Sequence, residues 1–189
     1  MAASNHHALS DAAEFLSGSA GRQSQVRSFG YALLVLLIAV SSLSRADVSM
    51  ELRALDGEYV NLNQYIGNGN WVLVMLWATD CAICKREKPA ISAFHDKHRH
   101  KDALVLGVAL DGYDKIAEIR RYLVEHKPSF PTLVGNIARV SVDYRMLTSE
   151  SLRGTPTYLL FSPAGELLGN NPGPVRPAAV EAFMARRGK

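Results

Sequence analysis

The chain has 189 residues, of which 48% are hydrophobic and 21% are charged, and its formal net charge is +3. These are values of a globular protein, so they exclude a chain that is disordered throughout and fit one domain with an extension. No dense run of lysine and arginine is interleaved with aromatic residues, and we therefore expect no nucleic-acid partner.

The chain begins with a polar segment that is followed by an apolar one. Residues 1–21 are small and polar and show no periodicity, and we expect residues 1–28 to form a disordered tail. Residues 29–43 carry no charge, follow two arginines and lead to the small residue Ala46, which is the order typical of a signal peptide. The uninterrupted apolar run is shorter than the about 20 residues that span a bilayer. We expect residues 29–46 to be a cleaved signal peptide or a retained membrane anchor, with a buried core helix as the third alternative.

Residues 47–189 carry the patterns of one folded domain, which either of the first two interpretations places in the periplasm or another extracytoplasmic compartment. Residues 50–55 and 58–62 flank Asp56–Gly57, a strong turn signal, and predict a small β-hairpin. Residues 71–77 (WVLVMLW) form an unbroken apolar run, which is typical of a strand covered on both faces of its sheet.

The later part of the domain alternates between helical and strand patterns. The predicted elements are a helix over 82–101 that Pro89 should kink, a buried strand over 103–110, an amphipathic helix over 113–126, a hairpin of 157–161 and 166–168, and a last helix over 177–187. A strand–helix–strand order favours parallel pairing, and a late hairpin favours antiparallel pairing. We therefore expect an α/β domain with a central mixed β-sheet flanked by helices.

The two cysteines of the chain, Cys81 and Cys84, are three positions apart. A structural disulfide framework would use more cysteines and close longer loops, and a structural zinc site would need two more ligands at suitable spacing. Cys81 falls between a predicted strand and the helix that follows it, and a helix N-terminus stabilises a thiolate. We therefore expect Cys81 to be the nucleophile and Cys84, one turn further on, to resolve the mixed disulfide.

Two segments carry a resemblance to a known family. Residues 77–85 (WATDCAICK), with Pro89 five positions after the second cysteine, resemble the active-site segment of thioredoxin-like proteins. Residues 152–159 (LRGTPTYL) resemble the cis-proline loop of the same proteins. The upstream hairpin is similar to that of the TlpA/ResA branch, the exported thiol–disulfide oxidoreductases. The resemblance implies a thioredoxin-like fold with an N-terminal β-hairpin extension.

The resemblance also implies site residues and partners. Besides the two cysteines, the residues that it places in the active-site and substrate-binding loops are Trp77, Asp80, Ala82, Ile83, Thr155 and Pro156. It implies protein disulfides as substrates, a membrane thiol transporter as electron donor, and a role in cytochrome c maturation or related assembly. We expect a monomer that uses no cofactor beyond the redox-active disulfide and no metal.

One departure from the family pattern concerns proton transfer. Met75 stands where thioredoxins carry a buried acid, so the proton acceptor for Cys84 must be another group. Glu87, Lys85 and water are the candidates.

Two further departures lie beside the cysteines. Asp80 stands where an aromatic residue is usual, and its negative charge opposes thiolate formation at Cys81 unless it is solvated. Ala82–Ile83 replaces the usual dipeptides, which contain proline, so the reduction potential of the family cannot be carried over. We expect a reducing rather than a strongly oxidising couple.

Other interpretations fit parts of the sequence less well. His95, His98 and His100 cluster with Asp96 and could share a metal, but basic residues are also favoured at a helix C-terminus, which is the interpretation we prefer. A copper metallochaperone of the same fold would space its cysteines as CxxxC, and a peroxidase would carry a threonine where Ala78 stands. A non-catalytic binding module with a permanent disulfide stays open.

Overall fold

The computed structural model describes residues 49–187, so the expectations for residues 1–46 lie outside the described part of the chain. Its strands are β1 (Glu51–Arg53), β2 (Tyr59–Asn61), β3 (Trp71–Trp77), β4 (Ala103–Ala109), β5 (Thr132–Val134), β6 (Thr157–Phe161) and β7 (Leu167–Pro172). Its helices are α2 (Ala82–His98), α3 (Ile116–His126), α4 (Ile137–Thr148) and α5 (Pro177–Arg187), and 3₁₀ turns cover Leu62–Gln64 and Tyr113–Lys115. Within residues 49–187, no helix has both the length and the apolar character needed to cross a membrane.

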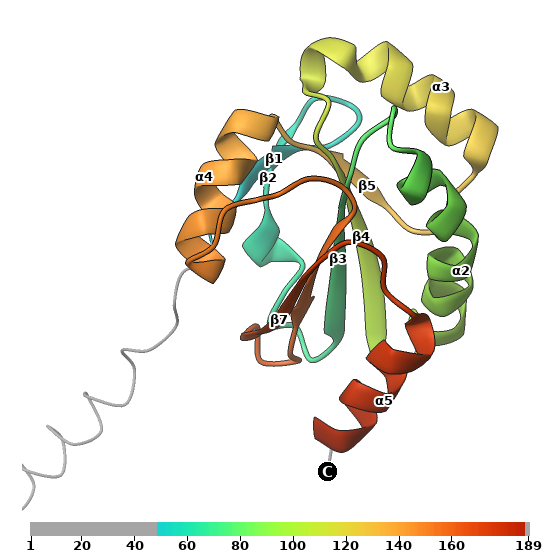
Figure 1. The fold of residues 1–189 in the computed structure, drawn as a ribbon, viewed down its shortest axis with the longest axis vertical. Coiled ribbons are helices and arrows are strands. Elements are labelled where there is room, and N and C mark those ends of the chain that lie inside the picture. Colours follow the sequence, from blue (N-terminus) through green and yellow to red (C-terminus); the bar gives the residue numbers. More distant parts are fainter. Residues whose placement is uncertain (1–48, 188–189) are drawn as a thin grey trace, which may run out of the picture. The chain divides into compact units, whose positions relative to one another are not determined.

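The described strands form one mixed sheet in the order β2-β1-β5-β4-β3-β6-β7. The strands β3, β4 and β5 run parallel, whereas the pairs β1–β2, β1–β5, β3–β6 and β6–β7 are antiparallel. Helices α2, α3 and α5 cover one face of the sheet, and α4 covers the other (Figure 1). The predicted α/β fold, with a central mixed sheet and helices on both faces, is confirmed.

Strand β3 supplies both halves of the hydrophobic core. All seven of its side chains are buried, and they alternate between the two faces of the sheet. Met75 and Trp77 belong to the core that the sheet shares with α2, α3 and α5, whereas Val74 and Leu76 belong to the core shared with α4. A strand that is covered on both faces needs no polar positions, which explains the unbroken apolar run in the sequence.

The predicted N-terminal hairpin is present as β1 and β2. Gly57 has a φ of +102° in the turn, a conformation that glycine adopts because it has no Cβ. Its backbone N–H donates to the carbonyl of Ala54, and the backbone N–H of Glu58 donates to the Asp56 carboxylate. Because β1 also pairs with β5, the hairpin extends the main sheet.

The structure differs from the sequence-based prediction in two elements and in several boundaries, since α3 begins at Ile116 and β7 extends to Pro172. Strand β5 and helix α4 were not predicted, and α2, which contains Pro89, ends at His98 rather than at residue 101. Strand β5 has three residues, which is too short to show a period. Helix α4 exposes Val142 and Met146, and these residues blur the apolar stripe that marks an amphipathic helix.

The N-cap of α4 can be tested by substitution of Asn136. The side-chain oxygen of Asn136 accepts hydrogen bonds from the backbone N–H groups of Ala138 and Arg139. We expect Asn136→Ala to lower the free energy of unfolding by about 1 kcal/mol, because these N–H groups lose their acceptor. Chemical denaturation measures the change. Asn136→Ser keeps an acceptor and should lose clearly less, so equal losses in the two variants would argue against the cap.

Candidate active site at the start of helix α2

A disulfide joins Cys81 and Cys84 at the N-terminus of α2. Cys81 is the N-cap residue, and its Sγ accepts a hydrogen bond from the backbone N–H of Cys84 with an N···S distance of 3.1 Å. Cys81 is half-buried, whereas Cys84 has no exposed surface. The sulfur of Cys81 is therefore the accessible one, and it lies at the N–H groups and the positive end of the helix dipole.

The loop between β3 and α2 is held by the neighbouring strand. Because β3 and β4 are parallel, their carboxyl ends meet at the same edge of the sheet. The carboxylate of Asp111, just after β4, accepts hydrogen bonds from the backbone N–H of Thr79 at 3.1 and 3.2 Å and from the Thr79 hydroxyl. The backbone N–H of Leu110 donates to the carbonyl of Trp77 at 2.8 Å. These bonds fix the segment that leads into Cys81.

The cis-proline segment reaches the same end of the sheet from β6. Leu76 is the register partner of Thr157, so the chain leaving β3 and the chain entering β6 lie at one end of their strands. The Thr155–Pro156 peptide bond is cis, and the Pro156 carbonyl accepts a hydrogen bond from the backbone N–H of Gly173 at 2.8 Å. The structure thus brings together the two segments that the sequence separates by about 70 residues.

The predicted loop residues divide between the surface and the core. Asp80 and Ala82 are exposed, and 39% of Ile83 is exposed. Trp77 is fully buried, and its ring centroid lies 4.9 Å from that of Tyr122. Trp77 therefore lies beneath the loop and not on its surface, because it is the last residue of β3 that faces the core.

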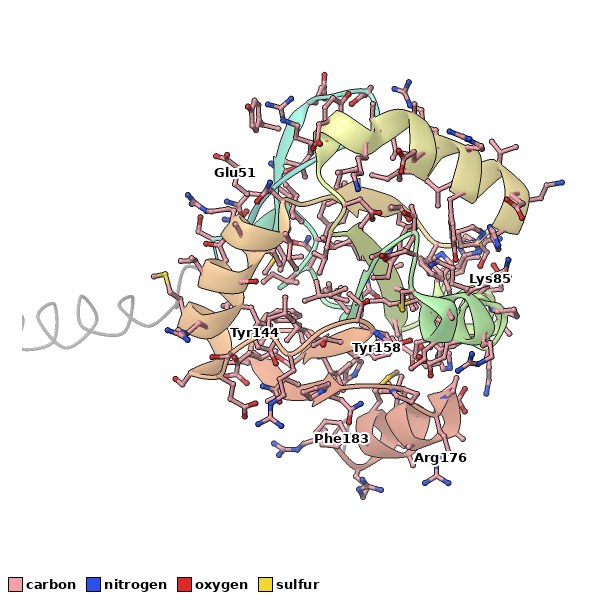
Figure 2. All side chains as sticks on the ribbon, turned by 45° about the horizontal axis from the view of Figure 1, so that its top comes forward. Glu51, Lys85, Tyr144, Tyr158, Arg176 and Phe183 are labelled. Atoms are coloured by element: carbon pink, nitrogen blue, oxygen red, sulfur yellow. A yellow bond between two sulfur atoms is a disulfide. The ribbon has the colours of Figure 1, made fainter. Side chains whose placement is uncertain are left out.

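The structure places the two side-chain candidates for proton transfer differently. Lys85 is exposed on the outer side of α2 (Figure 2). Glu87 is half-buried, and its carboxylate accepts hydrogen bonds from the hydroxyl of Tyr158 at 2.9 Å and from the backbone N–H of Val175 at 3.0 Å. Burial and then the neighbouring Glu87 carboxylate raise the pKa of Tyr158. Glu87 thus ties α2 to β6 and to the segment before α5.

Sequence reasoning missed a buried lysine next to the site. Only 2% of Lys88 is exposed, and its Nζ lies 3.4 Å from the ring centroid of Trp77 and 3.3 Å from the hydroxyl of Tyr122. Burial lowers the pKa of Lys88 from 10.5 to about 7, although the Asp111 carboxylate opposes this shift. The available signal was its position four residues after Cys84, which puts both side chains on one face of the helix.

Two of the three histidines near the end of α2, His95 and His98, have structural partners. Nδ1 of His95 accepts the backbone N–H of Val105 at 3.1 Å, and burial is the main cause that lowers the pKa of His95. The ring of His98 lies between the carboxylates of Asp102, at 2.7 Å, and Glu181, at 3.2 Å. In the described part of the chain, no three His, Cys, Asp or Glu side chains are grouped so as to hold a metal ion.

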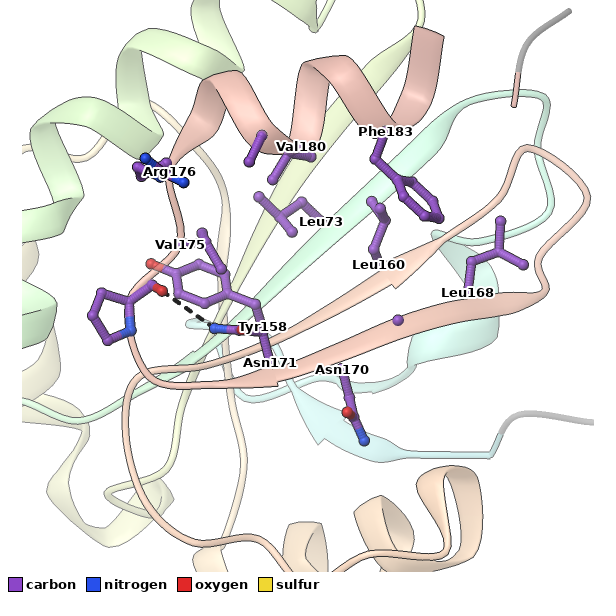
Figure 3. Close-up of a pocket in the computed structure, with 13 residues that line it drawn as sticks. Leu73, Tyr158, Leu160, Leu168, Asn170, Asn171, Val175, Arg176, Val180 and Phe183 are labelled. Atoms are coloured by element: carbon purple, nitrogen blue, oxygen red, sulfur yellow. Dashed lines mark hydrogen bonds between the residues drawn. The ribbon is translucent and has the colours of Figure 1, made fainter. Parts of the chain in front are cut away.

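A pocket of about 420 Å³ lies between α5 and the strands β6 and β7 (Figure 3). Val180 and Phe183 of α5 face Leu73 and Leu160 of the sheet across it, and Arg176 lies near its end (Figure 3). The lining is mainly apolar and includes neither cysteine nor the cis-proline. We assign this pocket no role in the chemistry of the disulfide.

Known proteins are similar to this chain in sequence. The chain is 26% identical over 160 residues to the thiol-disulfide oxidoreductase ResA of Halalkalibacterium halodurans, over 83% of this chain and 85% of that protein. It is 21% identical to the sporulation thiol-disulfide oxidoreductase A of Bacillus subtilis, over 66% of this chain and 70% of that protein.

Two solved structures show the fold. The thioredoxin domain of a thiol-disulfide oxidoreductase from Bacteroides vulgatus has a TM-score of 0.59 at 23% identity, over 76% of this chain and 99% of that one. The exposed lipoprotein thioredoxin of Streptococcus pneumoniae has a TM-score of 0.57 at 24% identity, over 73% and 98%. Both likenesses show that the fold is thioredoxin-like, as the sequence predicts.

The fold, the disulfide at a helix start and the cis-proline segment beside it together define a thioredoxin-fold protein. Residues 45–168, well over half of the chain, match the model of the AhpC/TSA family. The chain therefore belongs to the AhpC/TSA family and is a TlpA/ResA-like thiol–disulfide oxidoreductase.

The burial of Lys88 predicts a pH-dependent stability. Its folded-state pKa, about 7, lies below its ordinary value of 10.5, so between these values the unfolded chain holds a proton that the folded chain has lost. Folding therefore becomes more favourable as pH rises through this window. Relative to Lys88→Met, the wild type should gain on the order of 3 kcal/mol of unfolding free energy between pH 7 and pH 10.

Denaturation at several pH values measures the difference between wild type and Lys88→Met. The matched control is Lys101→Met, which removes an exposed lysine. A difference from wild type that is independent of pH for Lys88→Met, or a pH dependence shared by both variants, would contradict burial as the cause.

Proposed function

We propose that this protein is an exported reductase whose Cys81–Cys84 pair reduces disulfides of other extracytoplasmic proteins. The observation that carries this proposal is the unequal exposure of the two sulfurs at the start of α2, with Cys81 half-buried and Cys84 fully buried. A structural disulfide has no need of this asymmetry. Thiol–disulfide exchange needs one sulfur that meets the substrate and a second that is kept from it.

The exchange proceeds in two displacements. The Cys81 thiolate attacks one sulfur of the substrate disulfide, an S–S bond forms between them, and the other substrate sulfur leaves with its electron pair and takes up a proton. The Cys84 thiol then loses its proton and attacks Sγ of Cys81, which releases the second substrate sulfur in the same way. Two electrons have passed to the substrate, and the protein is left with the disulfide of this structure.

The surface around Cys81 suggests how a substrate is held. Ala82 and the partly exposed Ile83 offer apolar contacts beside the accessible sulfur. In this proposal the backbone of Thr155, just before β6, pairs with an extended segment of the substrate. The exposed Asp80 adds a negative charge at this rim, which disfavours substrates with an acidic residue beside their cysteine.

We infer that the electrons come from a membrane thiol transporter and that the protein acts as a monomer in cytochrome c maturation or related assembly. The disulfide is the one redox group that this chemistry needs. The names of the relatives support thiol–disulfide chemistry, and the apolar segment 29–43, with arginines before it, supports export.

The reduction potential of the pair tests the direction of electron flow. We expect a value near that of thioredoxin, about −270 mV, when the purified protein is equilibrated in graded thiol buffers. A potential near about −120 mV would make the protein an oxidant. A disulfide that fails to equilibrate would support a binding module, and stoichiometric copper held by the reduced pair would support a metallochaperone.

Substitution of each cysteine tests the order of attack. Cys84→Ser should accumulate a mixed disulfide with a protein substrate, because the accessible sulfur still attacks while the resolving thiol is missing. Cys81→Ser should form no such adduct, and its reduction of a test disulfide should fall by about a hundredfold or more. Gel analysis under non-reducing conditions detects the adduct. An adduct formed by Cys81→Ser at the same rate would reverse the assigned roles.

A further inference from the structure

In the proposed function, on which this inference rests, Cys84 must become a thiolate while it is buried. Its side chain has no exposed surface and belongs to the core with Trp77 and Tyr122. Apolar surroundings disfavour a thiolate. The helix dipole acts best on the N-cap sulfur of Cys81, since its effect falls off within the first turn. The resolving step therefore needs a neighbouring group that takes the proton of Cys84 and offsets the charge of its thiolate.

Lys88 is positioned to be this group. It lies four residues after Cys84 on α2, and residues so spaced share one helix face with Cβ atoms about 5–6 Å apart. Among residues 49–187, Lys88 and His95 are the two buried basic side chains, and His95 is bound to the backbone of Val105. We propose that Lys88 holds the proton that leaves Cys84 and is the buried counter-charge of the Cys84 thiolate.

The groups around the ammonium come from three other elements. The Trp77 ring of β3 and the Tyr122 ring of α3 lie 3.4 and 4.6 Å from Nζ, and aromatic faces favour a cation. The Asp111 carboxylate, just after β4, also favours the charged form. Helix α3 carries further titratable groups around Tyr122. A pocket of about 320 Å³ beside Tyr122 and Thr79 is lined by the α3 side chains Glu118, Arg121 and Glu125. The ring of His126 stacks on that of Tyr122, with ring centroids 4.0 Å apart.

These surroundings bring the pKa of Lys88 close to neutral pH. Burial destabilises the ammonium, whereas the rings and Asp111 stabilise it, and the pKa of about 7 results mainly from burial. A neutral amine can therefore accept a proton near neutral pH. A thiol and an amine that exchange a proton become an ion pair, which costs less in a buried site than a lone thiolate does.

In the resolving step, one proton moves from Cys84 to Lys88 and one electron pair forms the new disulfide bond. In the mixed disulfide, the proton of the Cys84 thiol passes to the Lys88 amine, and the thiolate electron pair forms the bond to Sγ of Cys81. The bond between Cys81 and the substrate sulfur breaks, and this sulfur leaves with the electron pair and takes a proton from solvent. The Lys88 ammonium returns its proton to solvent once the disulfide is formed.

The other candidates for this role are less well placed. Both carboxylate oxygens of Glu87 already accept hydrogen bonds, from Tyr158 and from the backbone of Val175. Lys85 is exposed, so water and salt screen its charge.

The first test measures Cys84 in a background where it is the single thiol. In Cys81→Ser, the far-ultraviolet absorbance of the thiolate is followed against pH. Adding Lys88→Met should lower the thiolate fraction at pH 8 by about tenfold, which corresponds to a rise of one unit in the pKa of Cys84. Lys88→Arg, which keeps the charge, should restore most of it. Arg86→Met, at an exposed position of the same helix, is the matched control and should change it little.

A second measurement does not depend on the folding of the Lys88 variants. Isotope-labelled lysine reports the titration of Lys88 by NMR in Cys81→Ser and in Cys81→Ser/Cys84→Ser. Because coupling is reciprocal, the Lys88 ammonium should persist to higher pH when the Cys84 thiolate can form. The same titration in both proteins, or a Lys88→Met effect no larger than that of Arg86→Met, would overturn the proposal.

A rate measurement tests the role of Lys88 separately from the proposed reductase function. Single-turnover release of substrate from the Cys81 mixed disulfide should slow about tenfold in Lys88→Met at pH 8, whereas the initial attack by Cys81 should be little changed. If both steps are unchanged, the role of Lys88 fails while the reductase stands. If the wild type reduces no disulfide, the proposed function fails, and the thiol titrations still decide whether Lys88 and Cys84 are coupled.

Discussion

The burial of β3 on both faces is the constraint on which the rest of the domain depends. Its alternate side chains fill two cores, so the helices must lie on both faces of the sheet. Parallel pairing with β4 brings Asp111 to the loop after Trp77, and antiparallel pairing with β6 brings Thr157 opposite Leu76. One strand therefore sets both the start of α2 and the place of the cis-proline segment.

Much of the fold could be predicted because its signals are local. The apolar run of β3 and the proline at the start of α5 mark these elements at their observed bounds, and Asp56–Gly57 marks the hairpin turn. The cysteine pair was equally visible, since its spacing and its place after a strand lie within one short segment. The three residues of β5 show no period, and the exposed apolar residues Val142 and Met146 hide the buried face of α4 in the sequence.

The sequence motifs predict the reacting cysteines of the site but not the buried residues around them. Lysine is a surface residue by default, and Lys88 is buried because Trp77 and Tyr122, from two other elements, close over it. Trp77 likewise could be placed near the cysteines from sequence, but the side of the sheet that it faces follows from the register of β3. Residue type and spacing identify the reacting sulfurs, whereas tertiary packing decides which neighbouring charges they meet.

The thiolates of the two cysteines are stabilised by different groups of the fold. Cys81 lies at the helix N-cap, where backbone N–H groups favour its thiolate whenever the pair is reduced. Cys84 carries charge only during the resolving step, and in the disulfide form neither sulfur is charged. A permanent cation beside it would then be buried without a full counter-charge, at a cost to stability. A lysine whose pKa lies near 7 avoids this problem, because it can take up its charge together with the thiolate and lose it when the disulfide closes.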